Sequence, residues 1–247
     1  MSTRSAALLT IPILTVSLLS PVLLSLPACS AAAEQCYEPT LDAAQCDPAS
    51  VEFSLASTNP YYPLIVGSAV VLEGMDGDEF IRVERVVLPD TEVVAGVETH
   101  VLEHKEFVDG ELHELARNFY VEAADGTVCY FGEEVDFYEG GELANHDGSW
   151  RVGEGDAKPG IIMPAAPAEG QAYFQENAPG QAIDMGRVFA VGQTQMINGQ
   201  SYDDVLTIMD VNPMDGCDEE EPKRYIPGIG EVDDNGVVLI EYTPGAG

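Results

Sequence analysis

Between residues 93 and 152 the chain alternates strand-like runs with turn-forming dipeptides. The turns are Asp109-Gly110, Asp125-Gly126 and Gly140-Gly141, and they are almost evenly spaced. Asp-Gly and Gly-Gly pairs between such runs are typical of β-hairpins, because these residues tolerate the positive φ angles of tight turns. The stretch therefore predicts an antiparallel meander with strands over 93–107, 112–123, 128–138 and 142–152.

One of these strands shows the alternation most clearly. Over 112–123 the apolar residues fall largely on one parity, and the polar residues Glu114, Asn118 and Glu122 fall on the other. Alternate side chains of a strand point to opposite faces, so this strand is predicted to have one buried and one wet face.

Further strand-like runs flank the meander, and no segment has the pattern of a long, capped amphipathic helix. The predicted strands lie at 66–73, 80–88, 186–197, 202–211, 225–232 and 237–242, with a type I′ turn at Asn198-Gly199. A proline-punctuated connector over 159–167 is expected to lie against the sheet. The predicted fold is all-β, a single domain over 58–247 in which an antiparallel meander forms a strongly curved sheet, a half-barrel or a barrel.

The beginning of the chain has the features of an export signal. Arg4 precedes an uncharged apolar run over 6–26, which is followed by small residues. The boundary Leu26-Pro27-Ala28-Cys29 resembles the bacterial lipobox, which implies cleavage before Cys29 and lipidation of that residue. We therefore expect a signal peptide over 1–28 and a lipidated cysteine with an acidic tether over 29–57. The alternatives are a simple secretory signal and an uncleaved membrane helix.

Acidic residues dominate the charge. The chain has 43 Asp and Glu against 10 Lys and Arg, a formal net charge of −33. Such a field repels phosphate backbones and anionic lipid surfaces, so nucleic acid is excluded as a partner, whereas cations and basic partners are favoured. A solvated acidic surface adapted to a saline medium explains the same composition.

Four cysteines remain once Cys29 is assigned to lipid. An even number in an exported chain predicts two disulfides, with three alternative pairings among Cys36, Cys46, Cys129 and Cys217. We expect a small local loop closed by Cys36–Cys46, and a Cys129–Cys217 bond that joins the meander to a later loop. A zinc site is the alternative.

Two patterns raise the question of metal chemistry. His100, Glu103 and His104 fit an inverted zinc-protease motif, which needs a helix to bring both imidazoles to one metal. In the strand predicted here the two histidines would stand roughly 13 Å apart, so a metal-dependent hydrolase is kept only as an alternative. Calcium binding by an acidic loop is a second alternative, at 76–79, 133–136 or 215–221.

Aromatic residues could line a cavity inside the curved sheet, or could simply form its core. The candidates for the cavity are Tyr61, Tyr62, Phe119, Tyr130, Phe131, Phe137 and Tyr138.

The chain resembles a family of uncharacterised bacterial exported proteins, many of which have lipoprotein signals. The resemblance runs through nearly all of the folded region and is carried by Asn59-Pro60-Tyr61-Tyr62-Pro63-Leu64, Tyr130-Phe131-Gly132-Glu133, Gly148-Ser149-Trp150, Pro159 to Ala165, Tyr202 to Leu206 and Tyr225 to Gly230. The last hairpin is also similar to the final strands of curved-sheet lipoproteins that carry or sense hydrophobic ligands. The resemblance implies no activity and no catalytic residues.

These observations together predict a lipid-anchored, extracytoplasmic bacterial lipoprotein of the cell envelope. We expect a monomeric, non-enzymatic binding or structural domain, with a hydrophobic small molecule or an envelope protein as its partner and no cofactor other than a candidate calcium ion.

Overall fold

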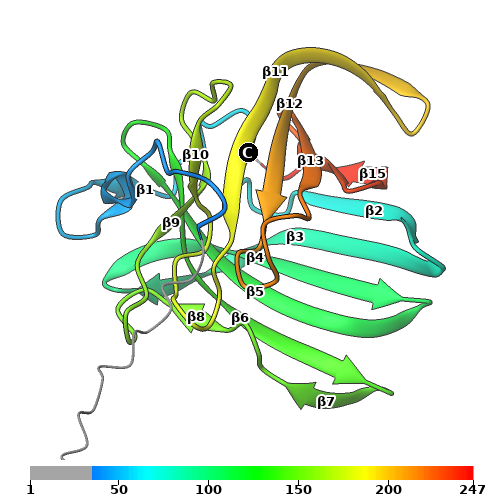
Figure 1. The fold of residues 1–247 in the computed structure, drawn as a ribbon, viewed down its shortest axis with the longest axis horizontal. Coiled ribbons are helices and arrows are strands. Elements are labelled where there is room, and N and C mark those ends of the chain that lie inside the picture. Colours follow the sequence, from blue (N-terminus) through cyan, green and yellow to red (C-terminus); the bar gives the residue numbers. More distant parts are fainter. Residues whose placement is uncertain (1–34, 247) are drawn as a thin grey trace, which may run out of the picture. The chain divides into compact units, whose positions relative to one another are not determined.

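The hairpins that the turn dipeptides predict become one antiparallel sheet in the computed structural model, which describes residues 35–246 (Figure 1). That range contains no α-helix and no helical segment with the length and hydrophobicity that a bilayer crossing requires. Its elements are η1 (Ala43–Cys46, a 3₁₀ helix), β1 (Phe53–Ser54), β2 (Ala69–Asp76), β3 (Glu79–Val94), β4 (Val97–Val108), β5 (Glu111–Ala123), β6 (Val128–Glu139), β7 (Glu142–Asn145), β8 (Trp150–Arg151), β9 (Gly160–Met163), β10 (Ala172–Phe174), β11 (Met185–Ile197), β12 (Gln200–Val211), β13 (Glu221–Ile226), β14 (Gly230–Asp234) and β15 (Val237–Thr243).

The sheet curls so that its two ends approach each other. Its strand order is β10-β11-β12-β13-β14-β15-β2-β3-β4-β5-β6-β7, with β1 paired to β5 and with β8 and β9 paired to β6. In Figure 1, β2 to β7 form one side of the curve and β10 to β13 the other. Strand β9 meets β10 where Gly160 touches the backbone of Gln175, but no strand ladder joins them. The predicted curved sheet is therefore confirmed, in its open form.

Three connections differ from the predicted strand boundaries. A turn at Ala95 and Gly96, whose φ angles are 49° and 81°, ends β3 and begins β4. The sequence predicts one continuous strand across this turn, because alanine carries none of the polar turn chemistry that marks Asp-Gly. The predicted strands over 142–152 and 225–232 are each divided by a further turn, and the connector at 159–167 contributes β9.

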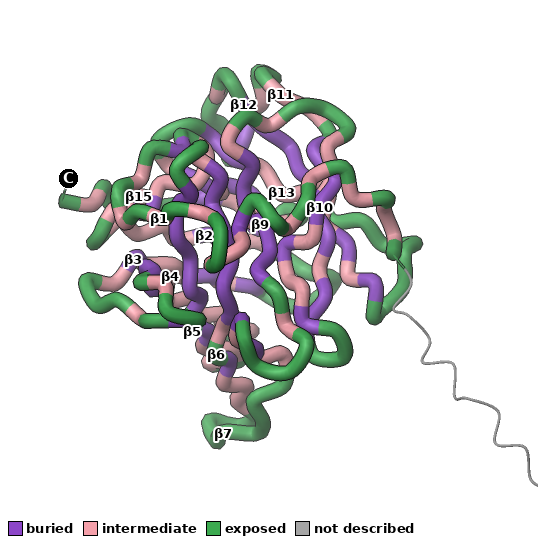
Figure 2. Tube along the Cα trace, turned by 90° about the vertical axis from the view of Figure 1, so that its left-hand side faces the viewer, coloured by how far each residue is buried: buried purple, intermediate pink, exposed green. Residues whose placement is uncertain are grey.

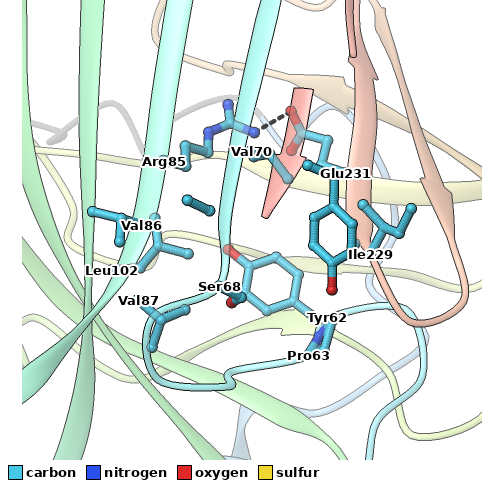
Figure 3. Close-up of a pocket in the computed structure, with 13 residues that line it drawn as sticks. Tyr62, Pro63, Ser68, Val70, Arg85, Val86, Val87, Leu102, Ile229 and Glu231 are labelled. Atoms are coloured by element: carbon cyan, nitrogen blue, oxygen red, sulfur yellow. Dashed lines mark hydrogen bonds and ion pairs between the residues drawn. The ribbon is translucent and has the colours of Figure 1, made fainter. Parts of the chain in front are cut away.

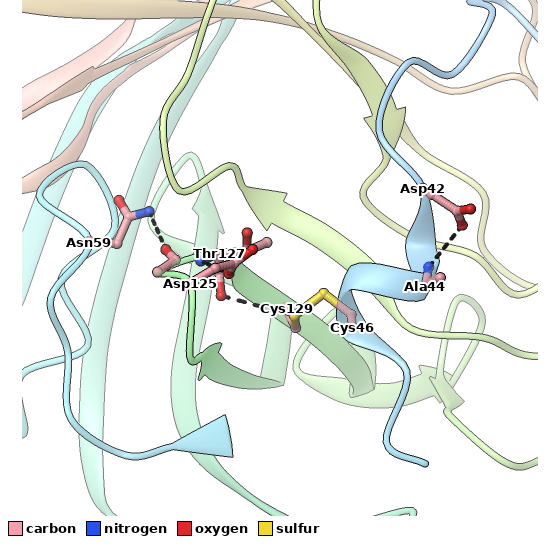
Figure 4. Close-up of a disulfide and its surroundings, with 8 residues drawn as sticks. Asp42, Ala44, Cys46, Asn59, Asp125, Thr127 and Cys129 are labelled. Atoms are coloured by element: carbon pink, nitrogen blue, oxygen red, sulfur yellow. Dashed lines mark hydrogen bonds between the residues drawn. A yellow bond between two sulfur atoms is a disulfide. The ribbon is translucent and has the colours of Figure 1, made fainter. Parts of the chain in front are cut away.

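Residues 35–57, which the sequence assigned to the tether, are attached to the sheet. Strand β1 pairs with the end of β5, and Phe53 packs edge-on against Phe131, with ring centroids 5.4 Å apart. Cys46 is fully buried beside β6 (Figure 4). The signal peptide and Cys29 lie outside the described residues.

The two disulfides are present, but the expected pairing is wrong. The bonds join Cys36 to Cys217 and Cys46 to Cys129, across 181 and 83 residues of sequence. Sequence proximity favoured a small Cys36–Cys46 loop, whereas η1 presents Cys46 to the outer face of β6, where Cys129 lies (Figure 4). One bond therefore ties the N-terminal segment to β6, and the other ties it to the loop between β12 and β13.

The strands β5 and β6 have two faces of different character. One face carries Phe119, Val121 and Phe131, each at most 2% exposed, and it is covered in part by residues 40–57. Figure 2 shows these strands as largely buried, in contrast to the exposed β7. The other face carries Glu114 and Asn118 and points into the curve of the sheet, where it meets β12 to β14 across a cavity.

Candidate functional site

A polar cavity of about 310 Å³ lies inside the curve. Strands β3 to β6 supply one side, β12 to β14 supply the other, and the loop between β10 and β11 contributes to the wall. It is lined by Tyr62, Arg85, Leu102, His104, Glu106, Glu114, Asn118, Tyr120, Tyr130, Glu133, Ile162, Gln175, Glu176, Asp184, Asp210, Lys223, Tyr225, Glu231 and Asp234. Eight of these residues carry a carboxyl group, and only Leu102 and Ile162 are aliphatic.

A bulge in β6 brings two of the lining residues to the same face. Asn118 pairs with Glu133, and Tyr120 pairs with Tyr130. Between these two pairs β6 therefore contains one more residue than β5. Gly132 absorbs the extra residue with a φ of 137°, and a Cβ atom at this position would lie 2.4 Å from the carbonyl oxygen of Trp150. Because a bulge redirects side chains, both Tyr130 and Glu133 point into the cavity.

The acids of one wall are compensated by basic side chains. Arg85 forms ion pairs with Glu231 and, at 3.1 Å, with Asp234. Lys223 Nζ lies 3.1 Å from Asp210 and 3.8 Å from Asp234. Burial disfavours the charged form of Asp234, but the attraction of Lys223 and Arg85 outweighs it and lowers its pKa to about 2. Arg85 and Lys223 thus neutralise most of the charge of three carboxylates.

The acids on β4 to β6 and on the loop between β10 and β11 have no such partners. In residues 35–246 no basic side chain forms an ion pair with Glu106, Glu114, Glu133, Glu176 or Asp184, all of which line the cavity. Glu106 and Glu114 stand directly opposite each other on β4 and β5, an arrangement in which like charges repel. Burial, together with Glu106, raises the pKa of Glu114 to about 7.

The remaining acids of this wall behave in the same way. Burial raises the pKa of Glu133 to about 7, and burial with the nearby Glu176 raises the pKa of Asp184 to about 7. Burial and the nearby Glu133 charge raise the pKa of Glu176 well above its ordinary value. Each of these two carboxyl groups therefore opposes the ionisation of the other.

Four tyrosine rings form a row in the cavity lining. The ring centroids of Tyr120 and Tyr130 are 4.5 Å apart, those of Tyr62 and Tyr120 are 5.2 Å apart, and Tyr225 lies 6.4 Å beyond Tyr62. Asn118 Oδ1 accepts a hydrogen bond from each of the Tyr120 and Tyr130 hydroxyl groups. The rings are thus fixed in position and offer both aromatic and polar surface.

An acidic hollow of about 280 Å³ shares Asp184, Asp210 and Lys223 with the cavity. The loop between β12 and β13 forms its rim with Asp215 and Glu219, and β13 adds Glu221. The Cys36–Cys217 disulfide holds this loop, and so do the contacts of Glu220 with Tyr37 and Arg187. We call this hollow the acidic mouth.

A smaller niche of about 50 Å³ lies on the other side of the Arg85–Glu231 pair (Figure 3). Val70, Val86 and Ile229 give it an apolar lining, and Tyr62 is shared with the main cavity. Figure 3 shows Arg85 facing Glu231 at this boundary. The ion pair therefore separates a polar space from an apolar one.

The His-x-x-Glu-His motif does not form a metal site. It lies on β4, where His100 Nε2 is 2.9 Å from the carbonyl oxygen of Leu55 and His104 Nδ1 accepts a hydrogen bond from Arg85. Burial and Arg85 lower the pKa of His104 to about 3. Glu103 is paired with Lys105 instead. The metal-dependent hydrolase alternative requires a helix here, and the structure shows a strand instead. The motif therefore does not support that alternative.

The acidic runs that suggested calcium are not gathered into a site either. Among residues 35–246 no three His, Cys, Asp or Glu side chains are placed to hold a metal ion together.

The predicted cavity aromatics are divided between several places. Tyr62 and Tyr130 line the cavity, whereas Phe119 and Phe131 are buried on the opposite face of the strands. The Tyr61 hydroxyl donates to the carbonyl oxygen of Asp204. Phe137, beside His113, and Tyr138 are half-buried outside the cavity lining.

The sequence analysis did not identify the carboxyl groups of the cavity lining as one site. The polar parity of β5 gave a signal for Glu114 and Asn118, but nothing in the sequence indicated that this face is the concave one. Comparisons with protein-family models, curated proteins and solved structures give no match to this chain.

Proposed function

We propose that this protein is a lipid-anchored, extracytoplasmic binding protein that holds a small polar molecule in the cavity of its curved sheet. The observation that carries the proposal is the cavity lining, in which buried carboxyl, amide and phenol groups converge from both sides of the sheet. Convergent polar groups with perturbed pKa values in a concave site are typical of ligand-binding sites. The volume falls at the lower end of the usual range for small-molecule pockets, roughly 300–1,000 Å³. The polar lining favours a water-soluble ligand over the hydrophobic one that the sequence suggested.

The anchor would keep the acidic mouth close to the membrane. Cys36 follows Cys29 by seven positions in the sequence, and a chain of that length spans at most roughly 25 Å. Cys36 is bonded to Cys217, in the loop that forms the rim of the acidic mouth. A ligand would thus enter or leave near the bilayer surface.

Native mass spectrometry of the protein purified from its own host's envelope tests the proposal. We expect a bound small molecule on the wild-type chain. Asn118→Trp, which fills the middle of the cavity, should lose that molecule, and Leu143→Trp, at a half-exposed position on β7, should keep it. Circular dichroism checks that both variants are folded. A molecule that remains bound to folded Asn118→Trp, or a wild-type chain without any bound molecule, would contradict the proposal.

A further inference from the structure

We propose that the ligand of this cavity is a small organic amine in its cationic form, held by the carboxyl groups of Glu114, Glu133, Glu176 and Asp184. This inference rests on the proposed function, because it names the chemical class of the molecule that the cavity takes.

The distribution of charge is the first argument. Arg85 and Lys223 are the two basic residues of the lining apart from the neutral His104, and both are occupied by Glu231, Asp234 and Asp210. An anionic ligand would therefore find no free cation in the described walls. Five carboxyl groups, on β4 to β6 and on the loop between β10 and β11, have no ion-pair partner, and buried carboxylates are costly unless a cation compensates them. A positively charged ligand would supply that compensation.

Unsatisfied buried atoms are the second argument, independent of the charge. Asp184 Oδ1 is buried and has no hydrogen-bond donor within residues 35–246. The indole N–H of Trp150, a residue only 2% exposed, points toward the Glu176 carboxyl and favours its charged form, although no hydrogen bond of good geometry forms. Buried polar atoms are nearly always paired in folded proteins, so an acceptor without a donor indicates a missing partner. A primary ammonium group brings three N–H donors.

The shape of the site narrows the class of cation. No three carboxyl groups in the described part of the chain are placed to coordinate one metal ion, which favours a larger organic cation over a bare metal ion. The rings of Tyr120 and Tyr130 lie beside the acids, and aromatic faces attract cations within about 6 Å. The open acceptor on Asp184 favours an amine with N–H groups over a quaternary ammonium ion. The acidic mouth, with Asp215, Glu219 and Glu221, would concentrate cations at the entrance.

Titration calorimetry of the full folded domain with matched probes tests the inference. The probes are 1,4-diaminobutane, 1,4-butanediol and succinate, which are similar in length but differ in charge, in roughly 0.15 M salt to screen the acidic surface. We expect one diamine to bind per chain at about pH 8, and neither the diol nor succinate to bind. The single tryptophan provides a second readout, because Trp150 packs edge-on against Tyr130, with centroids 5.2 Å apart.

Variants separate binding in the cavity from attraction to the acidic surface. Glu133→Gln combined with Glu176→Gln should weaken diamine binding at least about tenfold, because the change removes two carboxyl groups that would form charge-assisted hydrogen bonds with the ammonium group. Glu142→Gln removes one charge from exposed β7 and should change the affinity less than about twofold. Equal weakening by both changes, or no saturable diamine binding by the wild type, would overturn the inference.

The inference and the proposed function can fail separately. A neutral or anionic molecule found in the cavity by native mass spectrometry would overturn the amine inference and leave the binding function intact. A bound molecule that Asn118→Trp does not displace would contradict both the amine inference and the proposed binding function.

Discussion

Replacing Glu114 by glutamine should make the domain more stable at alkaline pH. Glu114 faces Glu106 across the β4–β5 ladder and has no basic partner within residues 35–246. Its pKa rises from 4.5 to about 7, through burial and then the Glu106 charge. Glutamine keeps the shape of the side chain and removes the charge, so it isolates the electrostatic cost of the carboxylate in this wall.

The sign follows from proton linkage. The folded protein keeps the Glu114 proton up to about pH 7, whereas the unfolded chain releases it near pH 4.5. The stability contributed by this group is therefore fully present below pH 4.5 and is lost as the pH rises through about 7. At 1.36 kcal/mol for each tenfold change in proton affinity, the loss at about pH 8 is roughly 3 kcal/mol. Glu114→Gln escapes that loss and should melt about 6–12 °C higher than the wild type at that pH.

Thermal and urea unfolding at about pH 8 and about pH 4, with the disulfides intact, provide the assay. At about pH 4 the wild-type carboxyl is protonated in both states, so the variant and the wild type should differ by less than about 1 kcal/mol. Glu142→Gln on exposed β7 is the control and should change little at either pH. A variant that is less stable at about pH 8, or equally stabilised at both pH values, would show that Glu114 is not an uncompensated charge.

Two further predictions concern the covalent and close-packed contacts of the fold. Replacing both Cys46 and Cys129 by alanine opens a loop of 83 residues. On the chain-entropy model this change should lower the free energy of unfolding, measured by urea unfolding, by about 4.5 kcal/mol. A loss below about 1 kcal/mol would contradict the pairing. Gly160→Ala would place a Cβ atom 1.8 Å from the carbonyl oxygen of Gln175 and should cost about 1–3 kcal/mol in the same assay; an unchanged urea midpoint would show that β9 and β10 do not meet in this way.

The sequence predicted most hairpins because their turns carry their own chemistry. Asp109-Gly110, Asp125-Gly126 and Asn198-Gly199 all supply positive φ angles at the connections between neighbouring strands. The turn at Ala95-Gly96 depends on a single glycine and on the pairing of β3 with β4, so local sequence could not separate it from a continuous strand. Turn chemistry is local and can be read from the sequence, whereas ladder register belongs to the whole sheet.

The disulfide pairing could not be read for a related reason. Cys36 and Cys46 are close in sequence, but the pairing of β1 with β5 brings the N-terminal segment to the sheet, and η1 places Cys46 beside Cys129 of β6. The entropy cost of closing a loop rises only slowly with the length of the loop. A short separation in sequence is therefore weak evidence that two cysteines are bonded, once the rest of the fold fixes their positions. What decides the pairing is which surface the N-terminal segment covers, and that depends on the curvature.

Curvature also explains why the candidate site was missed although its residues were noticed. The alternation in β5 correctly separates Glu114 and Asn118 from Phe119 and Val121, but alternation alone does not say which face is concave. In this fold the N-terminal segment covers part of the apolar face from outside, so the polar face is left to line the interior of the curve. Charged groups on a concave face lose water and repel one another, whereas on a convex face they would be solvated at little cost. The five uncompensated acids therefore lower the stability of the fold. Adaptation to a saline medium does not explain them, because it requires acids only on the solvated surface. A cationic ligand that neutralises them gives their position in the interior a physical reason.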